Sequence, residues 1–337
     1  MAQIGIGKTG LRAEQNGFGA LPIQRISPAD AVYLLRKAYD GGINYYDSAR
    51  GYTDSEEKLG MAFGGMWDKV IIATKTPAGT VEQFWRDLDT SLRTLKTGCI
   101  DIYQFHNPPF CPKPGDPSGL YDAMVQAKQQ GKIRFIGITN HRLNVAAEAV
   151  ESGLYDTLQF PLSYLSAERE LALVEACGEK EMGFIAMKAL SGGLITNSAA
   201  ACAWLIRFKE LIPIWGVQRE WELDEFLSYI KNPPTLTEEL LSCIEGDQRE
   251  LQGNFCRGCG YCMPCPQGIV ISMCARASLL LKRAPPEMLL SEQGRAMMKK
   301  AGDCTECGQC SAKCPYGLDT PALLKKNYQD FQEALAG

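Results

Sequence analysis

Short apolar runs alternate with longer amphipathic stretches between residues 15 and 230. The runs of strand length are Gly17–Ala20, Ile43–Asp47, Val70–Thr74, Ile100–Phe105, Ile133–Ile138, Thr157–Phe160, Gly183–Met187 and Ile212–Gly216. The stretches of helical character between and after them are Pro28–Tyr39, Ser55–Ala62, Val81–Leu95, Leu120–Gln130, Leu143–Glu151, Ala167–Cys177, Ala199–Phe208 and Leu223–Ile230. This repeated strand–helix alternation predicts an α/β fold, a parallel (β/α)8 TIM barrel.

An open doubly wound sheet is the alternative arrangement of such units. It would normally carry a Gly-x-Gly-x-x-Gly turn directly after its first strand. The segment from Gly5 to Gly10 has those letters, but no apolar run precedes it. We therefore interpret it as the turn of an N-terminal hairpin.

The alternating pattern stops at Pro233 and Pro234. Residues 235–252 are polar with helical character, and further helix-like stretches cover Ile271–Lys282 and Pro286–Met298. We predict a barrel domain at residues 1–233 and a small, helix-rich second domain at residues 234–337.

Composition narrows the class of protein. The chain has 337 residues, 45% of them hydrophobic, and a net charge of −4, which suits a large buried core and argues against a nucleic-acid partner. It contains no apolar run long enough for a membrane span and no N-terminal signal peptide. We expect a cytoplasmic protein.

Two cysteine runs near the C-terminus carry the strongest chemical signal. Each has three cysteines spaced three residues apart and then a Cys-Pro pair, and the second run matches the bacterial ferredoxin spacing in full. In that arrangement the Cys-Pro cysteine binds the cluster of the other run. We therefore assign one [4Fe–4S] cluster to Cys256, Cys259, Cys262 and Cys314, and a second to Cys304, Cys307, Cys310 and Cys265.

Structural zinc is the alternative for paired Cys-x-x-Cys motifs, but zinc needs neither the triplet nor the Cys-Pro cysteine. Cys274 lies between the runs without a motif of its own, and we interpret it as a spare thiol. Two clusters predict oxygen sensitivity, an anaerobic or microaerobic setting, and an electron-transfer partner such as a ferredoxin, a flavodoxin or an oxidoreductase.

Four residues at or near predicted strand ends form a candidate catalytic group. Asp47, Lys75 and His106 fall at strand C-termini, where the active sites of such barrels lie, and Tyr52 follows in the loop after Asp47. Lys75 and His106 close to the Tyr52 phenol would lower its pKa, so that it acts as an acid near neutral pH. Asp47 would pair with Lys75.

These segments resemble those of the aldo-keto reductases, here followed by a two-cluster ferredoxin-like domain. The resemblance rests on Asp47–Tyr52, Ile71–Lys75, Asp101–His106 and the loop that begins at Met187, and it extends over residues 5–230. It implies that Tyr52 is the general acid/base, tuned by Lys75 and His106, with Asp47 supporting Lys75. It also implies nicotinamide contacts from Thr139, Asn140, Gln159, Met187, Lys188, Gly216 and Arg219.

The stretch after the eighth predicted strand departs from the family pattern. There the family commonly binds the 2′-phosphate of NADPH through a basic residue, a hydroxyl and an arginine. Glu222 falls near the arginine position, Phe226 falls near an asparagine position, and only Arg219 is basic. This weakens the case for NADP(H) and leaves NAD(H), or no nicotinamide, open.

Hydride transfer moves two electrons, whereas each cluster takes one, and a flavin commonly joins the two kinds of step. Three arrangements follow: a nicotinamide-dependent reductase with structural clusters, a flavin bridge, or delivery of electrons directly from cluster to substrate. The leading hypothesis is an oxidoreductase acting on a small carbonyl or alcohol, with sugar-derived compounds as candidate substrates. The alternatives are an electron-transfer or redox-sensing protein with a ligand-binding barrel, and a cluster-assisted lyase or dehydratase.

Overall fold

The computed structural model describes residues 1–251, 255–283 and 287–336. The chain divides into two compact units. Unit 1 comprises residues 1–189 and 199–240, and unit 2 comprises residues 190–198 and 241–337. Residues 190–198 thus pack with the C-terminal unit, although they follow a barrel strand in the sequence. The sequence-based domain limit at residue 233 stays a prediction.

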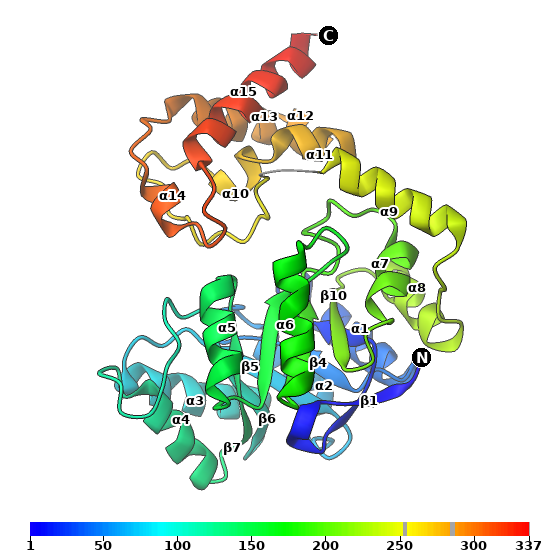
Figure 1. Cartoon of the computed structure of the whole chain (residues 1–337), viewed down its shortest axis with the longest axis vertical. Coiled ribbons are helices and arrows are strands. Elements are labelled where there is room, and N and C mark those ends of the chain that lie inside the picture. Colours follow the sequence, from blue (N-terminus) through cyan, green and yellow to red (C-terminus); the bar gives the residue numbers. More distant parts are fainter. Residues whose placement is uncertain (252–254, 284–286, 337) are drawn as a thin grey trace. The chain divides into compact units, whose positions relative to one another are not determined.

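Unit 1 is a closed parallel barrel, which confirms the predicted fold class. Its strands follow the order β10-β3-β4-β5-β6-β7-β8-β9, with helices around them (Figure 1). The strands are β3 Gly17–Gly19, β4 Tyr45–Asp47, β5 Ile71–Thr76, β6 Ile100–His106, β7 Ile133–Thr139, β8 Thr157–Pro161, β9 Gly183–Met187 and β10 Leu211–Gly216.

Two of the barrel helices, α1 (Pro28–Asp40) and α3 (Val81–Leu95), begin at a residue whose hydroxyl caps them. Ser27 accepts a hydrogen bond from the Asp30 amide at the start of α1, which has Pro28 at its first position, and Thr80 caps α3 in the same way. The helices of unit 1 are α1 Pro28–Asp40, α2 Ser55–Phe63, α3 Val81–Leu95, α4 Leu120–Gln129, α5 Leu143–Ser152, α6 Glu168–Glu179, α7 Ser198–Leu205 and α8 Glu220–Lys231, with the short η2 Pro22–Arg25. Helix α9, Glu238–Glu250, contains the boundary between the units.

An N-terminal hairpin covers the beginning of the barrel strands. Strands β1 (Gln3–Gly5) and β2 (Arg12–Glu14) pair antiparallel around the short helix η1 (Gly7–Thr9), as the sequence predicted, although a short strand does precede the turn. Ile6 and Leu11 pack into a buried cluster with strand residues such as Tyr45 and Ile102. Apolar packing thus fills this end, and the carboxyl ends of the strands are left for chemistry.

Unit 2 is rich in helices, as predicted. It contains α10 Ile271–Cys274, α11 Ala277–Arg283, α12 Glu287–Leu290, α13 Glu292–Lys299, η3 Lys300–Asp303, α14 Gln309–Lys313 and α15 Thr320–Ala336. Helix α15 contacts α10, α11, α13, α14 and η3, and its Asn327 binds the Ser278 backbone amide and hydroxyl. This long helix therefore supports the two cysteine-bearing segments.

Candidate active site and metal centres

The carboxyl ends of three adjacent strands bring together the acidic, basic and imidazole groups singled out in the sequence. Asp47 ends β4, Lys75 lies near the end of β5 and His106 ends β6, and these strands pair in that order. Lys75 Nζ lies 2.6 Å from Asp47 Oδ1 and 2.5 Å from the Ser48 carbonyl oxygen. Only 2% of Asp47 and 1% of Lys75 are exposed, so this is a buried ion pair.

Tyr52 joins this group from the loop after β4. Lys75 Nζ lies 5.2 Å from the centroid of the Tyr52 ring. The imidazole of His106 meets the same ring edge-on, with centroids 5.8 Å apart and an interplanar angle of 83°. Part of Tyr52 remains accessible to solvent, as a group that meets a substrate must be.

The electrostatics of these residues differ from the sequence-based expectation in one respect. We expected Lys75 and His106 to lower the pKa of Tyr52, but burial of the phenol, followed by the charge of Asp47, raises it well above its ordinary value. Burial, and then the charge of Lys75, lowers the pKa of His106 to about 3. At neutral pH the site therefore holds a protonated phenol beside a neutral imidazole.

Burial also acts on the ion pair itself. It raises the pKa of Asp47 and lowers the pKa of Lys75, and in each case the charge of the partner opposes the effect. Each group therefore depends on the other to stay ionised in the barrel interior.

Two glutamines complete the network around Asp47. Gln159 donates to Asp47 Oδ1 at 3.2 Å, and Gln104 donates to Asp47 Oδ2 at 3.3 Å and to Gln159 Oε1 at 3.0 Å. The family resemblance implies a nicotinamide contact for Gln159, whereas Gln104 was not among the residues expected at the site. The signal was present, because Gln104 lies two residues before His106 and therefore faces the same side of the strand.

The other candidate nicotinamide contacts lie around the same end of the barrel. Thr139 pairs in register with His106 and Gln159, and its hydroxyl lies 3.8 Å from the sulfur of Met187. Asn140 donates to the Pro108 carbonyl oxygen at 2.8 Å and accepts from the Arg142 amide. A primary amide has two N–H donors, so this local bond leaves Asn140 able to donate once more. Lys188 follows β9 with a φ of 56°.

Gly216 and Arg219 lie at the end of β10 and at the start of α8. Here Glu222 Oε2 accepts from the backbone amides of Gln218 and Arg219, at 2.9 and 3.0 Å. A carboxylate therefore caps this helix. Phe226, only 4% exposed, stacks on Trp215 with ring centroids 4.4 Å apart, so it is part of the core.

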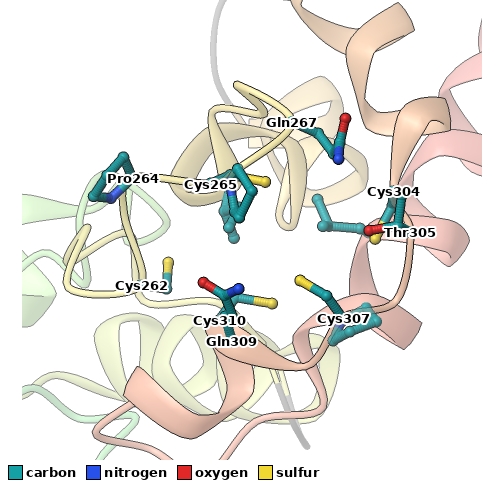
Figure 2. A pocket seen from close by; sticks show the side chains of 13 residues that line it. Cys262, Pro264, Cys265, Gln267, Cys304, Thr305, Cys307, Gln309 and Cys310 are labelled. Carbon is teal, nitrogen blue, oxygen red and sulfur yellow. The ribbon is translucent and has the colours of Figure 1, made fainter.

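In unit 2, a small cavity is lined by Cys262, Cys265, Cys304, Cys307 and Cys310. Figure 2 shows these cysteines around the cavity, with Cys262 and Cys265 from one segment facing the other three. Cys265 of the first run thus lines the same cavity as the triplet of the second run, and the assignment of these four cysteines to one cluster stays a prediction.

A neighbouring small cavity is lined by Cys256, Cys259, Cys262 and Cys314. Cys262 and Ile271 line both cavities, so the two spaces are adjacent. Here Cys314 of the second run stands with the triplet of the first. We call the two groups the Cys256 site (Cys256, Cys259, Cys262, Cys314) and the Cys304 site (Cys304, Cys307, Cys310, Cys265).

The thiol donor sets that line these cavities fit iron–sulfur clusters. In the described residues, no three His, Cys, Asp or Glu side chains converge as ligands of one metal ion. Burial raises the pKa of Cys262 to about 12, so a metal cation would be needed to stabilise its thiolate.

Cys274 lines neither cavity. It is fully buried, its sulfur lies 3.7 Å from the Met297 carbonyl oxygen, and burial raises its pKa to about 11. It is therefore a protonated core thiol.

In the part of the chain that the structure describes, no helix is long and apolar enough to cross a membrane.

Comparisons with known proteins agree with this organisation. The profile of the Aldo/keto reductase family matches residues 4–201, and that of a 4Fe-4S dicluster domain matches residues 255–319. An L-galactose dehydrogenase from Arabidopsis thaliana is 30% identical over 211 residues, which are 57% of this chain and 66% of that protein. A 6-dehydroglucose reductase from Novosphingobium aromaticivorans is 31% identical over 132 residues, 34% of this chain and 42% of that protein.

Both alignments thus cover less than two thirds of the relative's length. Among solved structures, an aldo-keto reductase from Bacillus halodurans in its holo form superposes with a TM-score of 0.64 at 20% identity. The match covers 73% of this chain and 96% of that one. At this identity the likeness shows the barrel fold.

Proposed function

Because the chain belongs to the Aldo/keto reductase family and carries a 4Fe-4S dicluster domain at its C-terminus, we propose that it is an iron–sulfur oxidoreductase that interconverts a carbonyl compound and an alcohol. The observation that carries the proposal is the convergence of Tyr52, His106 and the Lys75–Asp47 pair at the carboxyl ends of the barrel strands. The substrate is a small carbonyl derived from a sugar, the class to which the names of the two curated relatives point.

Tyr52 is the general acid and base. The raised pKa of its phenol keeps the proton in place until a carbonyl oxygen develops negative charge. The Lys75 cation, 5.2 Å from the ring centroid, stabilises the charge that remains when the proton leaves. The neutral imidazole of His106 is a hydrogen-bonding group for the substrate oxygen. Asp47 acts through Lys75, which it holds in position.

A nicotinamide, when bound, supplies or accepts the hydride. Asn140 and Gln159 supply amide groups of the kind that hold a carboxamide, at the end of the barrel where Tyr52 lies. The 2′-phosphate of NADPH does not fit equally well, because Glu222 brings a carboxylate to the start of α8 and itself caps that helix. The dinucleotide in this proposal is therefore NADH rather than NADPH.

The Cys256 and Cys304 sites each hold one [4Fe–4S] cluster in this proposal, which provides one-electron chemistry. The donor sets and the cavities support the assignment. The partner is a one-electron carrier protein such as a ferredoxin or flavodoxin. A flavin could join one-electron and two-electron steps, and its content in the purified protein tests for this.

The test begins with anaerobic purification and analysis of iron, acid-labile sulfide and flavin in one sample. We expect about eight iron atoms and an equal amount of sulfide per chain. NADH oxidation with a panel of sugar-derived aldehydes then measures activity, and Tyr52→Phe should lower kcat by about 100-fold or more. Tyr33→Phe is the matched control, because Tyr33 is exposed and binds Glu220 on the outer surface.

The outcomes separate the alternatives. Full activity in Tyr52→Phe would show that the assignment of the acid is wrong. Zinc in place of iron would remove the electron-transfer part of the proposal and leave a reductase barrel. A loaded protein that converts its substrate without net redox change would be a lyase, and one whose clusters are reduced but that turns over no substrate would be an electron carrier.

A further inference from the structure

The two Cys-x-x-Cys loops of unit 2 share one backbone conformation but carry opposite charges. Their third residues, Gly258 and Glu306, have φ values of +64° and +53°. The glycines that follow the second cysteine of each loop, Gly260 and Gly308, have φ values of +82° and +72°. The left-handed region suits glycine and strains other residues, so Glu306 is an unexpected residue at its position.

At Gly258 the space of a side chain is taken by the guanidinium of Arg276. A Cβ atom on Gly258 would lie 2.7 Å from Arg276 Cζ and 2.8 Å from Nη1. Arg276 Nη1 donates to the Gly192 carbonyl oxygen at 2.9 Å, and a Cβ on Gly192 would lie 3.0 Å from the same nitrogen. Both glycines have positive φ, and together they make room for a flat cation beside the Cys256 loop.

The charge of Arg276 is not neutralised by a carboxylate. Within residues 1–251, 255–283 and 287–336, no Asp or Glu forms an ion pair with Arg276, and its Nε atom is buried without a hydrogen-bond partner. Its other terminal nitrogen reaches only the sulfur of Met273, at 3.9 Å. A cation that faces a cysteine loop and lacks a counter-charge would favour any negative charge gained there.

The Cys304 loop has the opposite character. Glu306, at the place equivalent to Gly258, is exposed, and so is Cys307 beside it. A non-glycine residue with positive φ persists where the surroundings or the function maintain it. A carboxylate at this point disfavours additional negative charge in the Cys304 site.

We propose that Arg276 and Glu306 set the two cysteine sites at different reduction potentials, so that an electron rests at the Cys256 site rather than at the Cys304 site. This rests on the proposed function, in which each site holds one [4Fe–4S] cluster. One electron, given by an external one-electron donor, leaves the Cys304 site and arrives at the Cys256 site without making or breaking a bond or moving a proton.

The surroundings of the two sites agree with a higher reduction potential at the Cys256 site than at the Cys304 site. Cys307 is exposed, whereas Cys256, Cys259 and Cys314 are only partly exposed, so a carrier protein can approach the Cys304 site most directly. Arg276, beside the Cys256 site, donates to the Gly192 carbonyl oxygen. Gly192 belongs to residues 190–198 of unit 2, which follow β9 in the sequence. Cys262, which lines both cavities, lies between the sites.

The test is a redox titration of the full chain, loaded with iron and sulfide and followed by electron paramagnetic resonance, with dithionite as reductant. The wild type should show two one-electron waves. Arg276→Gln should lower the higher wave and leave the other in place, and Glu306→Gln should raise only the lower wave. We expect each variant to change the equilibrium constant about tenfold, which is 59 mV for a one-electron couple.

Controls separate charge from structure. Arg276→Lys keeps the cation and should keep the higher wave within a fraction of that shift. Arg295→Gln removes an exposed arginine that donates to the Leu290 carbonyl oxygen on α12, and neither wave should move. If Arg276→Gln fails to load iron, the potentials of Glu306→Gln and Arg276→Lys still test whether these two charges set the potentials of the two sites.

Failure of this inference can be told apart from failure of the proposed function. A wild type without about eight iron atoms per chain would contradict the proposed function. A loaded wild type with a single potential for both centres would overturn only the inference. So would variants that both move the same wave, or that move neither.

Discussion

Lys75 Nζ lies 2.6 Å from Asp47 Oδ1 across two adjacent barrel strands, and neither residue is more than 2% exposed. Each charge is therefore compensated almost entirely by the other and by the amides around them. The pair is local in space although 28 positions separate its members in the sequence.

Asp47→Asn should destabilise the barrel by about 3 kcal/mol, because it leaves a buried ammonium group without its counter-charge. Urea unfolding followed by tryptophan fluorescence is a suitable measurement, since Trp67, Trp85, Trp204, Trp215 and Trp221 all belong to unit 1. The control is Asp89→Asn, because Asp89 pairs with Lys132 on the surface, and its loss should cost under about 1 kcal/mol. Equal effects of the two changes would contradict the buried-pair argument.

Gln104→Leu should have a smaller effect on stability, about 1 kcal/mol. The change removes one donor from Asp47, but it also removes a buried acceptor atom, Gln104 Oε1, that has no hydrogen-bond partner among the described residues. The same urea measurement applies, and kcat should fall while KM changes little, because Gln104 orients Asp47 rather than substrate. An unchanged kcat together with an unchanged stability would show that the glutamine network is not needed.

The low pKa of His106 makes barrel stability depend on pH. The unfolded chain binds a proton at His106 below about pH 6.5, whereas the folded chain does so only near pH 3. The contribution is therefore complete above pH 6.5 and is lost as the pH falls towards 3, with a slope of at most about 1.4 kcal/mol per pH unit. His106→Gln should flatten this part of the stability profile measured between pH 4 and 8, and an unchanged slope would contradict the assignment.

Glu222→Gln should raise kcat/KM with NADPH relative to NADH by about tenfold, since it removes a like charge from the place where a 2′-phosphate would bind. The glutamine side chain retains an oxygen that can accept from the Gln218 and Arg219 amides, so α8 should keep its cap. Glu225→Gln, one turn along the same helix, is the control and should leave the ratio unchanged. Steady-state kinetics with both dinucleotides measure the ratio. An unchanged ratio in Glu222→Gln would show that another feature decides the preference between NADH and NADPH.

Removal of either Cys-Pro cysteine should cost about half of the iron, and Cys274→Ser should cost none. Cys265→Ser should empty the Cys304 site, and Cys314→Ser should empty the Cys256 site, because each lines the cavity of the other run. The double variant Cys265→Ser/Arg276→Gln should then shift the potential of the remaining centre, whereas Cys314→Ser/Arg276→Gln should not. The reverse result would mean that each Cys-Pro cysteine binds the cluster of its own run.

Much of this protein could be predicted from local sequence. Apolar periodicity identified all the barrel strands because a parallel barrel strand is buried on both faces and reads as a short continuous apolar run. The spacing of the cysteines indicated an exchange of the fourth ligand, because Cys265 and Cys314 each stand before a proline in a known pattern. Asp47, Lys75 and His106 could be grouped because strand ends meet at one end of a barrel.

Other features depended on contacts between distant residues. The raised pKa of Tyr52 and the low pKa of His106 come from burial, and the role of Gln104 depends on its distance from Asp47. The guanidinium of Arg276 fills the space beside Gly258 because helix α11 is preceded by a turn that places it there. A sequence pattern fixes residue type and spacing, but desolvation and the charge at a point in space depend on which distant side chains fold together, and only the tertiary structure decides that.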